Sequence, residues 1–293
     1  MTRGAKALLI LAFAAFSAAA EQPHLSNGRL ELRPVAGDLE TTVRPLVRAA
    51  SGPAWIGWSV ATDRERQMCC WDSWHDGPCC SGCRLEGRGN FTSSSASDRA
   101  DAVKLEGGRE MLVLLRAEAG EITKLRTFSP DCALDAGGTT LFWIEGVRPG
   151  ESVRFLAGFM DAKDGSRAPQ RLADQALSAL AFHAEPKAID ILIDGARHAA
   201  TVHLRGQALF WLAQRAGDRA VQAIARALDE DPETEVKKKA VFALSQLPKQ
   251  EGVPLLIQTA RTNKNPAVRK QAFFWLGQSK DPRALAFFEQ VLR

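Results

Sequence analysis

The C-terminal half of the chain has the apolar spacing of helices. From about residue 168 onward, alanine and leucine recur at intervals of three and four residues, which places them on one face of successive helices. A segment that begins at Leu204 is repeated from Val236 and again from Val268, a constant period of 32 residues. Extended backward, the period reaches Leu172. The sequence therefore predicts four stacked helical hairpins, each too small to bury its apolar face alone.

The period creates columns of equivalent residues along the predicted array. Each first helix carries one alanine at a point where neighbouring backbones would approach closely, and each second helix carries a pair of apolar residues. The alanines are Ala176, Ala208, Ala240 and Ala272; the pairs are Ile191 and Leu192, Ala223 and Ile224, Leu255 and Leu256, and Phe287 and Phe288. This arrangement is that of an all-α solenoid.

The N-terminal half has a different pattern, rich in turns. Asp38 is predicted to cap a helix that runs to about residue 50, and Pro149 to begin a second helix that ends near Met160. Short alternating or β-rich runs predict strands, with a hairpin turn at 119–121. The predicted strands are 30–33, 55–60, 111–117, 122–128 and 139–144. This half is therefore expected to be a small α+β domain.

The N-terminus has the pattern of a secretory signal peptide. Arg3 and Lys6 precede an apolar run from Ala7 to Phe16, and small residues follow up to Glu21. The run is shorter than the ~20 residues that a spanning helix needs, which favours cleavage over an uncleaved membrane anchor. We expect a periplasmic or secreted protein with no membrane span after the signal is removed.

These patterns divide the chain into four parts. Residues 1–20 are the predicted signal peptide, 21–160 a Cys-rich α+β domain, 161–171 a linker, and 172–293 the repeat solenoid. Because the linker is short, the two domains are expected to touch. The domain would then cover the N-terminal end of the solenoid.

Charge and motif searches exclude several classes of protein. The formal net charge of +4 falls to +2 when the two basic residues of the signal are removed, which argues against a nucleic-acid partner. The sequence has no GxSxG, phosphate loop, HExxH or GxGxxG. His183, His198 and His203 have no cysteine or carboxylate pair near them in sequence. We therefore predict no catalytic residue, no metal site and no cofactor.

One sequence pattern in the repeats carries a family resemblance. The opening Val-Arg/Lys-x-x-Ala-x-x-x-Leu occurs at Val236 and Val268, and the acidic run Asp229-Glu230-Asp231 precedes the first of these. Together they resemble HEAT-like repeats, in particular the short type named after phycobilisome lyases. The resemblance covers 172–293 and implies a solenoid of the kind that serves adaptors, assembly factors and lyase scaffolds. The Cys-rich N-terminal region is similar to that of secreted bacterial HEAT-repeat proteins of unknown role.

Basic residues form one column of the predicted array. Arg205, Lys237 and Arg269 occupy the same repeat position. They are either a stripe that binds an acidic partner or a ladder in which each base pairs with acidic residues that end the previous unit. Asp229 and Asp231 lie just before Lys237 and favour the ladder. Such exposed pairs contribute only ~0 to 1 kcal/mol each.

Aromatic residues form two neighbouring columns. Trp211 and Trp275 share one position, and Phe210, Phe242 and Phe274 occupy the position before it. One column is expected to face the core and the other to be more exposed. Large aromatic residues are usually buried, so a ligand-facing stripe is the alternative. The two tryptophans, with the three basic residues, are the candidate interaction residues.

The six cysteines all lie in the first domain and predict a disulfide framework, because their number is even and the chain is expected to be exported. Neighbouring cysteines are too close to pair with each other, and several pairings remain open. The alternative is thiol-redox or metal chemistry in the cluster at 69–83, since Cys80 and Cys83 form a CxxC and His75 lies among the thiols. The cysteines are Cys69, Cys70, Cys79, Cys80, Cys83 and Cys132.

The sequence as a whole predicts an exported, non-catalytic interaction or scaffold protein of the cell envelope. Its concave solenoid face would hold another envelope or secreted protein, as yet unidentified. Homo-association through the last repeat, at Phe287 and Phe288, is a further expectation, because the last helix has few polar residues to cover the end of the array. The thiol-redox or metal protein is the alternative from another class, and a chromophore lyase ranks last.

Overall fold

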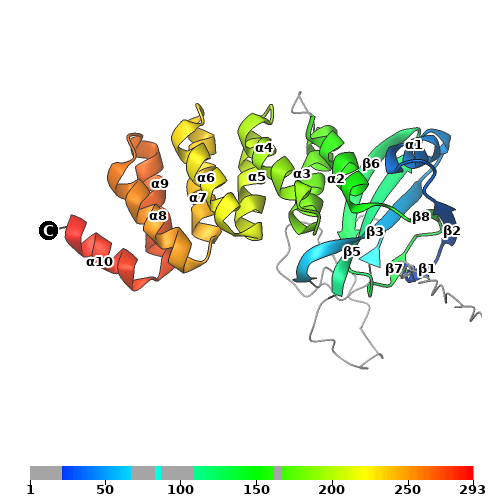
Figure 1. The fold of residues 1–293 in the computed structure, drawn as a ribbon, viewed down its shortest axis with the longest axis horizontal. Coiled ribbons are helices and arrows are strands. Elements are labelled where there is room, and N and C mark those ends of the chain that lie inside the picture. The colour runs from blue at the N-terminus through cyan, green and yellow to red at the C-terminus, as the bar shows by residue number, and fades with distance from the viewer. Residues whose placement is uncertain (1–21, 67–82, 87–107, 162–166, 293) are drawn as a thin grey trace, which may run out of the picture.

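The computed structural model describes residues 22–66, 83–86, 108–161 and 167–292. A mixed sheet with its covering helices lies at one end of an elongated molecule, and helices α3 to α10 extend from it in a row to the far end (Figure 1). The predicted order of an α+β domain followed by an all-α solenoid is therefore confirmed. None of the helices in the described ranges is long and apolar enough to span a bilayer.

The central sheet has five strands, close to the predicted positions. Its order is β2-β8-β3-β5-β6. Strand β8 pairs in parallel with both β2 and β3, and β3, β5 and β6 form an antiparallel meander. Ala119 and Gly120 have φ of 52° and 81°, as a two-residue hairpin turn requires between β5 and β6. The strands are β2 (Arg29–Pro34), β3 (Ala54–Arg66), β5 (Gly108–Glu118), β6 (Glu121–Phe128) and β8 (Thr140–Glu145).

Alternate residues of the sheet enter two different cores. Along β5, Met111 and Val113 face a first core, which also contains apolar residues of the helices. Leu112 and Leu114 face a second core on the other side of the sheet. On the side of the first core the sheet is covered by α1 (Leu39–Ala49), α2 (Pro149–Ala157) and α3 (Arg167–Phe182), and the 3-10 helix η1 (Gly158–Asp161) packs on α2 and α3. The second core is covered by a small parallel sheet that the sequence did not predict. That sheet consists of β1 (Leu25–Ser26), β7 (Leu134–Asp135) and β4 (Cys83–Arg84) in the order β1-β7-β4.

Both helices of this domain begin where the sequence predicted. Asp38 accepts a hydrogen bond from the backbone N–H of Thr41 at 2.8 Å, and the Thr41 hydroxyl accepts one from the Asp38 N–H at 3.2 Å, which completes a capping box. Pro149 occupies the first turn of α2. Trp58 of β3 donates a hydrogen bond from its indole nitrogen to the Ser152 hydroxyl at 2.9 Å, and this fixes α2 on the sheet.

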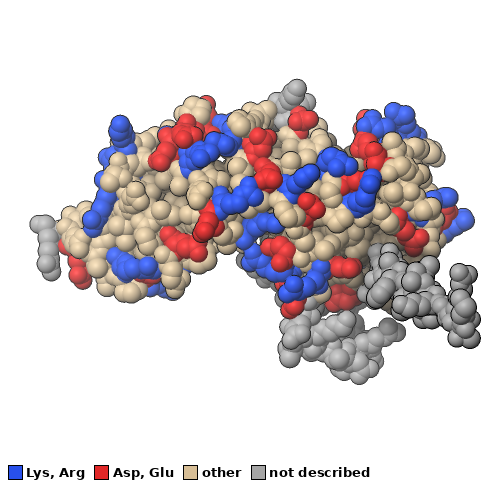
Figure 2. All heavy atoms as spheres, viewed as in Figure 1, with Lys and Arg blue, Asp and Glu red and all other residues tan. Residues whose placement is uncertain are grey.

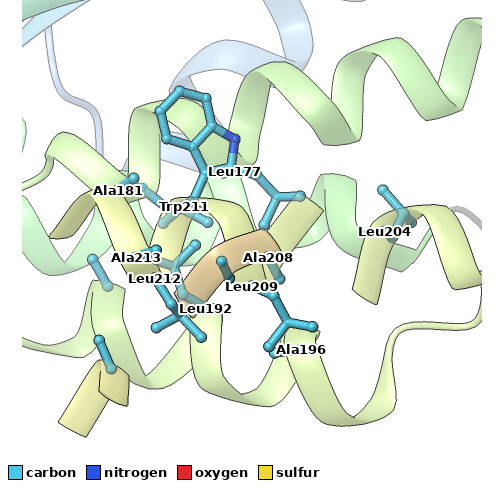
Figure 3. Close-up of a cluster of buried hydrophobic side chains, with 14 of the residues drawn as sticks. Leu177, Ala181, Leu192, Ala196, Leu204, Ala208, Leu209, Trp211, Leu212 and Ala213 are labelled. Atoms are coloured by element: carbon cyan, nitrogen blue, oxygen red, sulfur yellow. The ribbon is translucent and has the colours of Figure 1, made fainter. Parts of the chain in front are cut away.

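The C-terminal half contains four helical hairpins, as the period predicted. The column alanines Ala176, Ala208, Ala240 and Ala272 are fully buried, and Figure 3 shows Ala208 among the leucines of neighbouring helices. The array begins earlier than the predicted boundary at 172. Its helices are α3 (Arg167–Phe182), α4 (Lys187–His198), α5 (Val202–Arg215), α6 (Asp218–Glu230), α7 (Thr234–Gln246), α8 (Lys249–Thr262), α9 (Pro266–Ser279) and α10 (Pro282–Val291).

The first helices of the hairpins form the tighter layer of the array. Helix α5 packs on α3 and α7, and α7 packs on α9. The second helices separate further, since a cleft of about 390 Å³ opens between α6 and α8, lined by Leu228, Leu255 and Gln258 among others. The first helices therefore line the inner side of the curved array. We call this side the first-helix face.

The two domains touch, as the short linker predicted. The Ala184 N–H donates to the Ala61 carbonyl at 2.9 Å, and Thr62 and His183 form an antiparallel bridge at the same place. On β6, the Leu125 N–H donates to the Gln175 side chain at 2.9 Å. One apolar core runs from the sheet into the last repeat. The N-terminal domain thus closes one end of the array.

A buried histidine lies in this junction. His183 is fully buried, and its Nδ1 accepts a hydrogen bond from the Glu185 N–H at 3.1 Å. The Arg215 guanidinium donates to the His183 carbonyl at 2.7 Å, and the Arg64 guanidinium donates to the Arg215 carbonyl at 2.7 Å. Burial, and secondarily the charge of Arg215, lower the pKa of His183 to about 4. The ring is therefore neutral at pH 7.

The low pKa of His183 predicts acid sensitivity of the fold. Below pH 6.5 the unfolded chain binds a proton that the folded chain excludes until about pH 4, so the free energy of unfolding falls across this window, by up to about 3 kcal/mol from this residue. Urea denaturation at several pH values measures it. The variant His183→Asn keeps an acceptor near Nδ1 but does not titrate, and should lose less stability between pH 7 and pH 4. Equal losses in both proteins would contradict the prediction.

Candidate interaction surface

The three candidate basic residues cap the ends of preceding helices. Each lies one turn into its own first helix and donates to a backbone carbonyl at the C-terminal end of the second helix before it. These carbonyls lack partners within their own helix and carry its negative dipole end, which a cation stabilises. The three contacts are Arg205 to the Ala199 carbonyl at 3.1 Å, Lys237 to the Asp229 carbonyl at 2.8 Å and Arg269 to the Asn263 carbonyl at 2.8 Å.

The predicted ladder, in which each base pairs with an acidic side chain of the previous unit, is wrong. Of the three bases, Arg205 alone binds a carboxylate in the described structure, that of Asp231 at 2.9 Å, and Asp231 ends the same unit rather than the previous one. Both side chains are largely buried, with 13% and 5% of their surface exposed. The second oxygen of Asp231 accepts from the Glu233 N–H at 2.9 Å. Because these bases are engaged within the chain, they position helices.

The aromatic residues form one continuous row along the first-helix face. Phe210 and Phe242 stack with nearly parallel rings at a centroid distance of 6.1 Å, and Phe242 contacts Trp275 at 5.0 Å. The row continues to Phe274 at 5.0 Å from Trp275, and to Trp211 at 5.0 Å from Phe210. Every first helix from α5 to α9 therefore contributes rings to it.

Exposure along this row rises toward the last unit. Trp211 is buried and lies in the core shown in Figure 3, Phe210, Phe242 and Trp275 are half-buried, and Phe274 is 53% exposed. The expected division into a more buried and a more exposed column is confirmed, since Trp211 and Trp275 are each more buried than the phenylalanine beside them. Within each column, exposure is highest in the last unit. The reason is that the first helix of each following unit covers the rings before it, and no described helix covers α9 in this way.

A hollow of about 200 Å³ lies beside the exposed part of the row. Its lining includes Leu244, Gln246, Val253 and Gln278, and Trp275 forms part of one wall. The Trp275 indole N–H is buried and has no hydrogen-bond partner among the described residues. Apolar and amide groups therefore meet at this end of the first-helix face.

The last unit also holds most of the exposed apolar surface. Of the five large apolar side chains that are well exposed in the described ranges, four belong to it, and Leu285 is 61% exposed. Figure 2 shows a broad uncharged area over the C-terminal part of the array, and acidic and basic residues are intermixed elsewhere on the face that it draws. Phe287 is buried and Phe288 half-buried, because both pack on Phe273. The expectation that this pair forms the exposed end is therefore wrong.

The cysteines are divided between described and undescribed parts of the chain. Cys132 is buried in the second core with Leu85 and Leu134, and the backbone of Cys83 pairs with that of Leu134 in the small sheet. Two cysteine-bearing segments are thus neighbours. The other predicted disulfide residues lie outside the described residues, and the disulfide framework stays a prediction. Those residues are Cys69, Cys70, Cys79 and Cys80.

The described residues offer no metal centre. No group of three or more histidine, cysteine, aspartate or glutamate side chains lies close enough together there to bind an ion. Two histidines instead pair with single carboxylates. His203 contacts Asp174 at 2.8 Å between α5 and α3, where burial raises the pKa of Asp174 despite the opposing effect of His203. His198 contacts Asp194 at 2.8 Å on the surface of α4.

The repeat geometry has a counterpart among known sequences. Residues 221–293 match a family model described as HEAT repeats. That range runs from within α6 to the end of the array, and this part of the chain is similar to HEAT repeats. A solved structure of human deoxyhypusine hydroxylase in complex with glycerol is similar to this chain, with 23% identity, a TM-score of 0.35, and coverage of 44% of this chain and 43% of that one. The match thus spans less than half of that protein. No curated protein matches the chain.

The contacts of the basic column predict unequal effects of equivalent substitutions. Arg205→Leu leaves the buried Asp231 carboxylate without its cation and should lower the free energy of unfolding by about 3–5 kcal/mol. Arg269→Leu removes only carbonyl contacts and should lower it by about 1 kcal/mol. Urea denaturation at pH 7 measures both. Adding Asp231→Asn to Arg205→Leu should restore part of the loss, and equal losses in the two single variants would refute the account.

Proposed function

We propose that this protein is a non-catalytic interaction or scaffold protein whose HEAT-like array holds a partner protein on the first-helix face. The aromatic row carries this proposal. Half-buried rings and the 53% exposed ring of Phe274 lie in contact across three successive units. Clusters of accessible aromatic residues are typical of protein-binding surfaces, since they bury a large apolar area and lose little side-chain entropy.

The position of the N-terminal domain limits which repeat units a partner protein could contact. The first unit is covered by the sheet and α2, and its equivalent of Phe210 is the buried Ser178. The second to fourth units carry the accessible rings. A partner would therefore bind the part of the array distant from the sheet, and the N-terminal domain would protect the apolar end that a solenoid must cap.

We further propose export to the cell envelope, with another envelope or secreted protein as the partner. The signal-like N-terminus and the six cysteines of the first domain support this location. Association between two copies through the last repeat is a second proposed contact, supported by the exposed Leu285 and Leu292. In this setting the cysteines act as disulfide staples.

The location and the cysteine chemistry can be tested by the intact mass of the exported protein. We expect a chain that starts near Glu21, with no alkylated thiol before reduction and six after it, because an oxidising compartment favours closed disulfides. Native alkylation at Cys80 and Cys83, or a bound metal, would favour the thiol-redox or metal-binding alternative. Retention of residues 1–20 would contradict export through a cleaved signal.

The interaction proposal can be tested by photo-crosslinking in the cells that produce the protein. A photoreactive phenylalanine analogue at Phe274, which is 53% exposed on the first-helix face, should form an adduct with one distinct protein. The matched control carries the analogue at Gln222, an exposed position on the second helix of its hairpin. No adduct at Phe274, or equal adducts at both positions, would contradict the proposal.

A further inference from the structure

Polar side chains flank the phenylalanine on the first helices of the last three units. In each helix, a lysine or glutamine lies three or four residues before the phenylalanine and a glutamine lies four residues after it; the first position does not follow the 32-residue period, because Lys270 is the equivalent of Lys238. Spacings of three and four residues place these side chains on one strip of a helix. The strips are Gln207, Phe210 and Gln214 on α5; Lys239, Phe242 and Gln246 on α7; and Lys270, Phe274 and Gln278 on α9. We call the three strips together the Lys–Phe–Gln surface.

The lysines of this surface carry charge that the chain does not neutralise. Lys239 and Lys270 are exposed and form no ion pair in the described part of the protein. Their neighbour Lys238 differs, since it pairs with Glu235 at 3.0 Å. The stem of Lys239 lies against Gly206 of α5, where an added Cβ would come within 2.9 Å of the Lys239 Cγ. The Lys239 stem thus packs against α5 one turn before Phe210.

The glutamines supply hydrogen-bonding groups on the other side of the rings. Gln246 donates only to its neighbour Ser245, at 3.1 Å, and Gln246 and Gln278 also line the hollow beside Trp275. Within the described ranges, Gln214 and Gln278 make no side-chain hydrogen bond. A primary amide both donates and accepts, as a peptide group does, so this column matches the backbone of a bound chain.

We propose that the Lys–Phe–Gln surface binds an extended polypeptide segment that carries both acidic and apolar side chains. Acidic side chains meet Lys239 and Lys270, apolar side chains cover Phe242 and Phe274, and the glutamines bond the peptide backbone. Neighbouring helices pack ~8–10 Å apart, so the surface spans roughly 20 Å from α5 to α9. An extended chain rises ~3.3 Å per residue, so about six residues cross it. This inference rests on the proposed function and names the chemistry of the partner.

Fluorescence anisotropy of labelled peptides tests the inference with the full mature protein. The probe is a short peptide of alternating glutamate and leucine, and its counterpart replaces each glutamate with lysine. We expect saturable binding of the acidic peptide only, weakened by salt because the lysines are exposed. The double variant Lys239→Glu and Lys270→Glu should weaken binding about tenfold or more, since two attractive pairs become repulsive.

A matched control separates position from net charge. Lys187→Glu and Lys264→Glu together change the charge equally but lie at exposed positions outside the strips, at the start of α4 and before α9. The control should bind as the original protein does, and thermal unfolding by circular dichroism should confirm that both double variants are folded. Absent binding of the acidic peptide, equal binding of the basic one, or equal weakening by the control would overturn the inference. If an adduct still formed at Phe274, the interaction role would stand and the partner would bind by other chemistry.

Discussion

The burial of α3 between two different neighbours is the interaction on which the rest of the molecule depends. Every residue from 176 to 182 in this helix is buried, because β6 and α2 pack on one side and α5 on the other. A helical hairpin cannot bury its apolar face alone, so the first repeat is stable only because the sheet completes it. The junction at Thr62 and His183 adds backbone pairing to this apolar contact.

This arrangement explains why the described array is covered at the end that meets the sheet. At the sheet, the position equivalent to the ring column holds the small Ser178, which leaves room for close packing. Further along, the equivalent positions hold Phe210, Phe242 and Phe274, of which Phe274, in the unit furthest from the sheet, is the most exposed. The same sequence position is therefore buried in the packing near the domain and accessible away from it.

The sequence predicted the elements whose signal is repeated or periodic. Four hairpins follow from a constant period, and the five long strands and the cap at Asp38 follow from alternation and capping chemistry. The small sheet β1-β7-β4 was missed because strands of two residues have no periodicity to detect.

The details of the candidate surface were harder to predict for a physical reason. Arg205, Lys237 and Arg269 bind carbonyls at helix ends, and such groups have no signature in the side-chain sequence. Phe287 was expected at the surface but is buried, because its ring packs against Phe273 of another helix. Which columns touch each other depends on the angle at which neighbouring helices cross, and the repeat period does not specify that angle.

The continuous core has a consequence for the order in which the protein opens. In a repeat array each unit is held mainly by its neighbours, and among the described elements α10 packs mainly on α8 and α9, with Leu285 and Leu292 exposed. Local opening therefore begins at α10 and spreads toward the sheet, so amide hydrogens of the last unit exchange first. A segment bound across α5, α7 and α9 would slow that exchange, and so act as a removable last repeat.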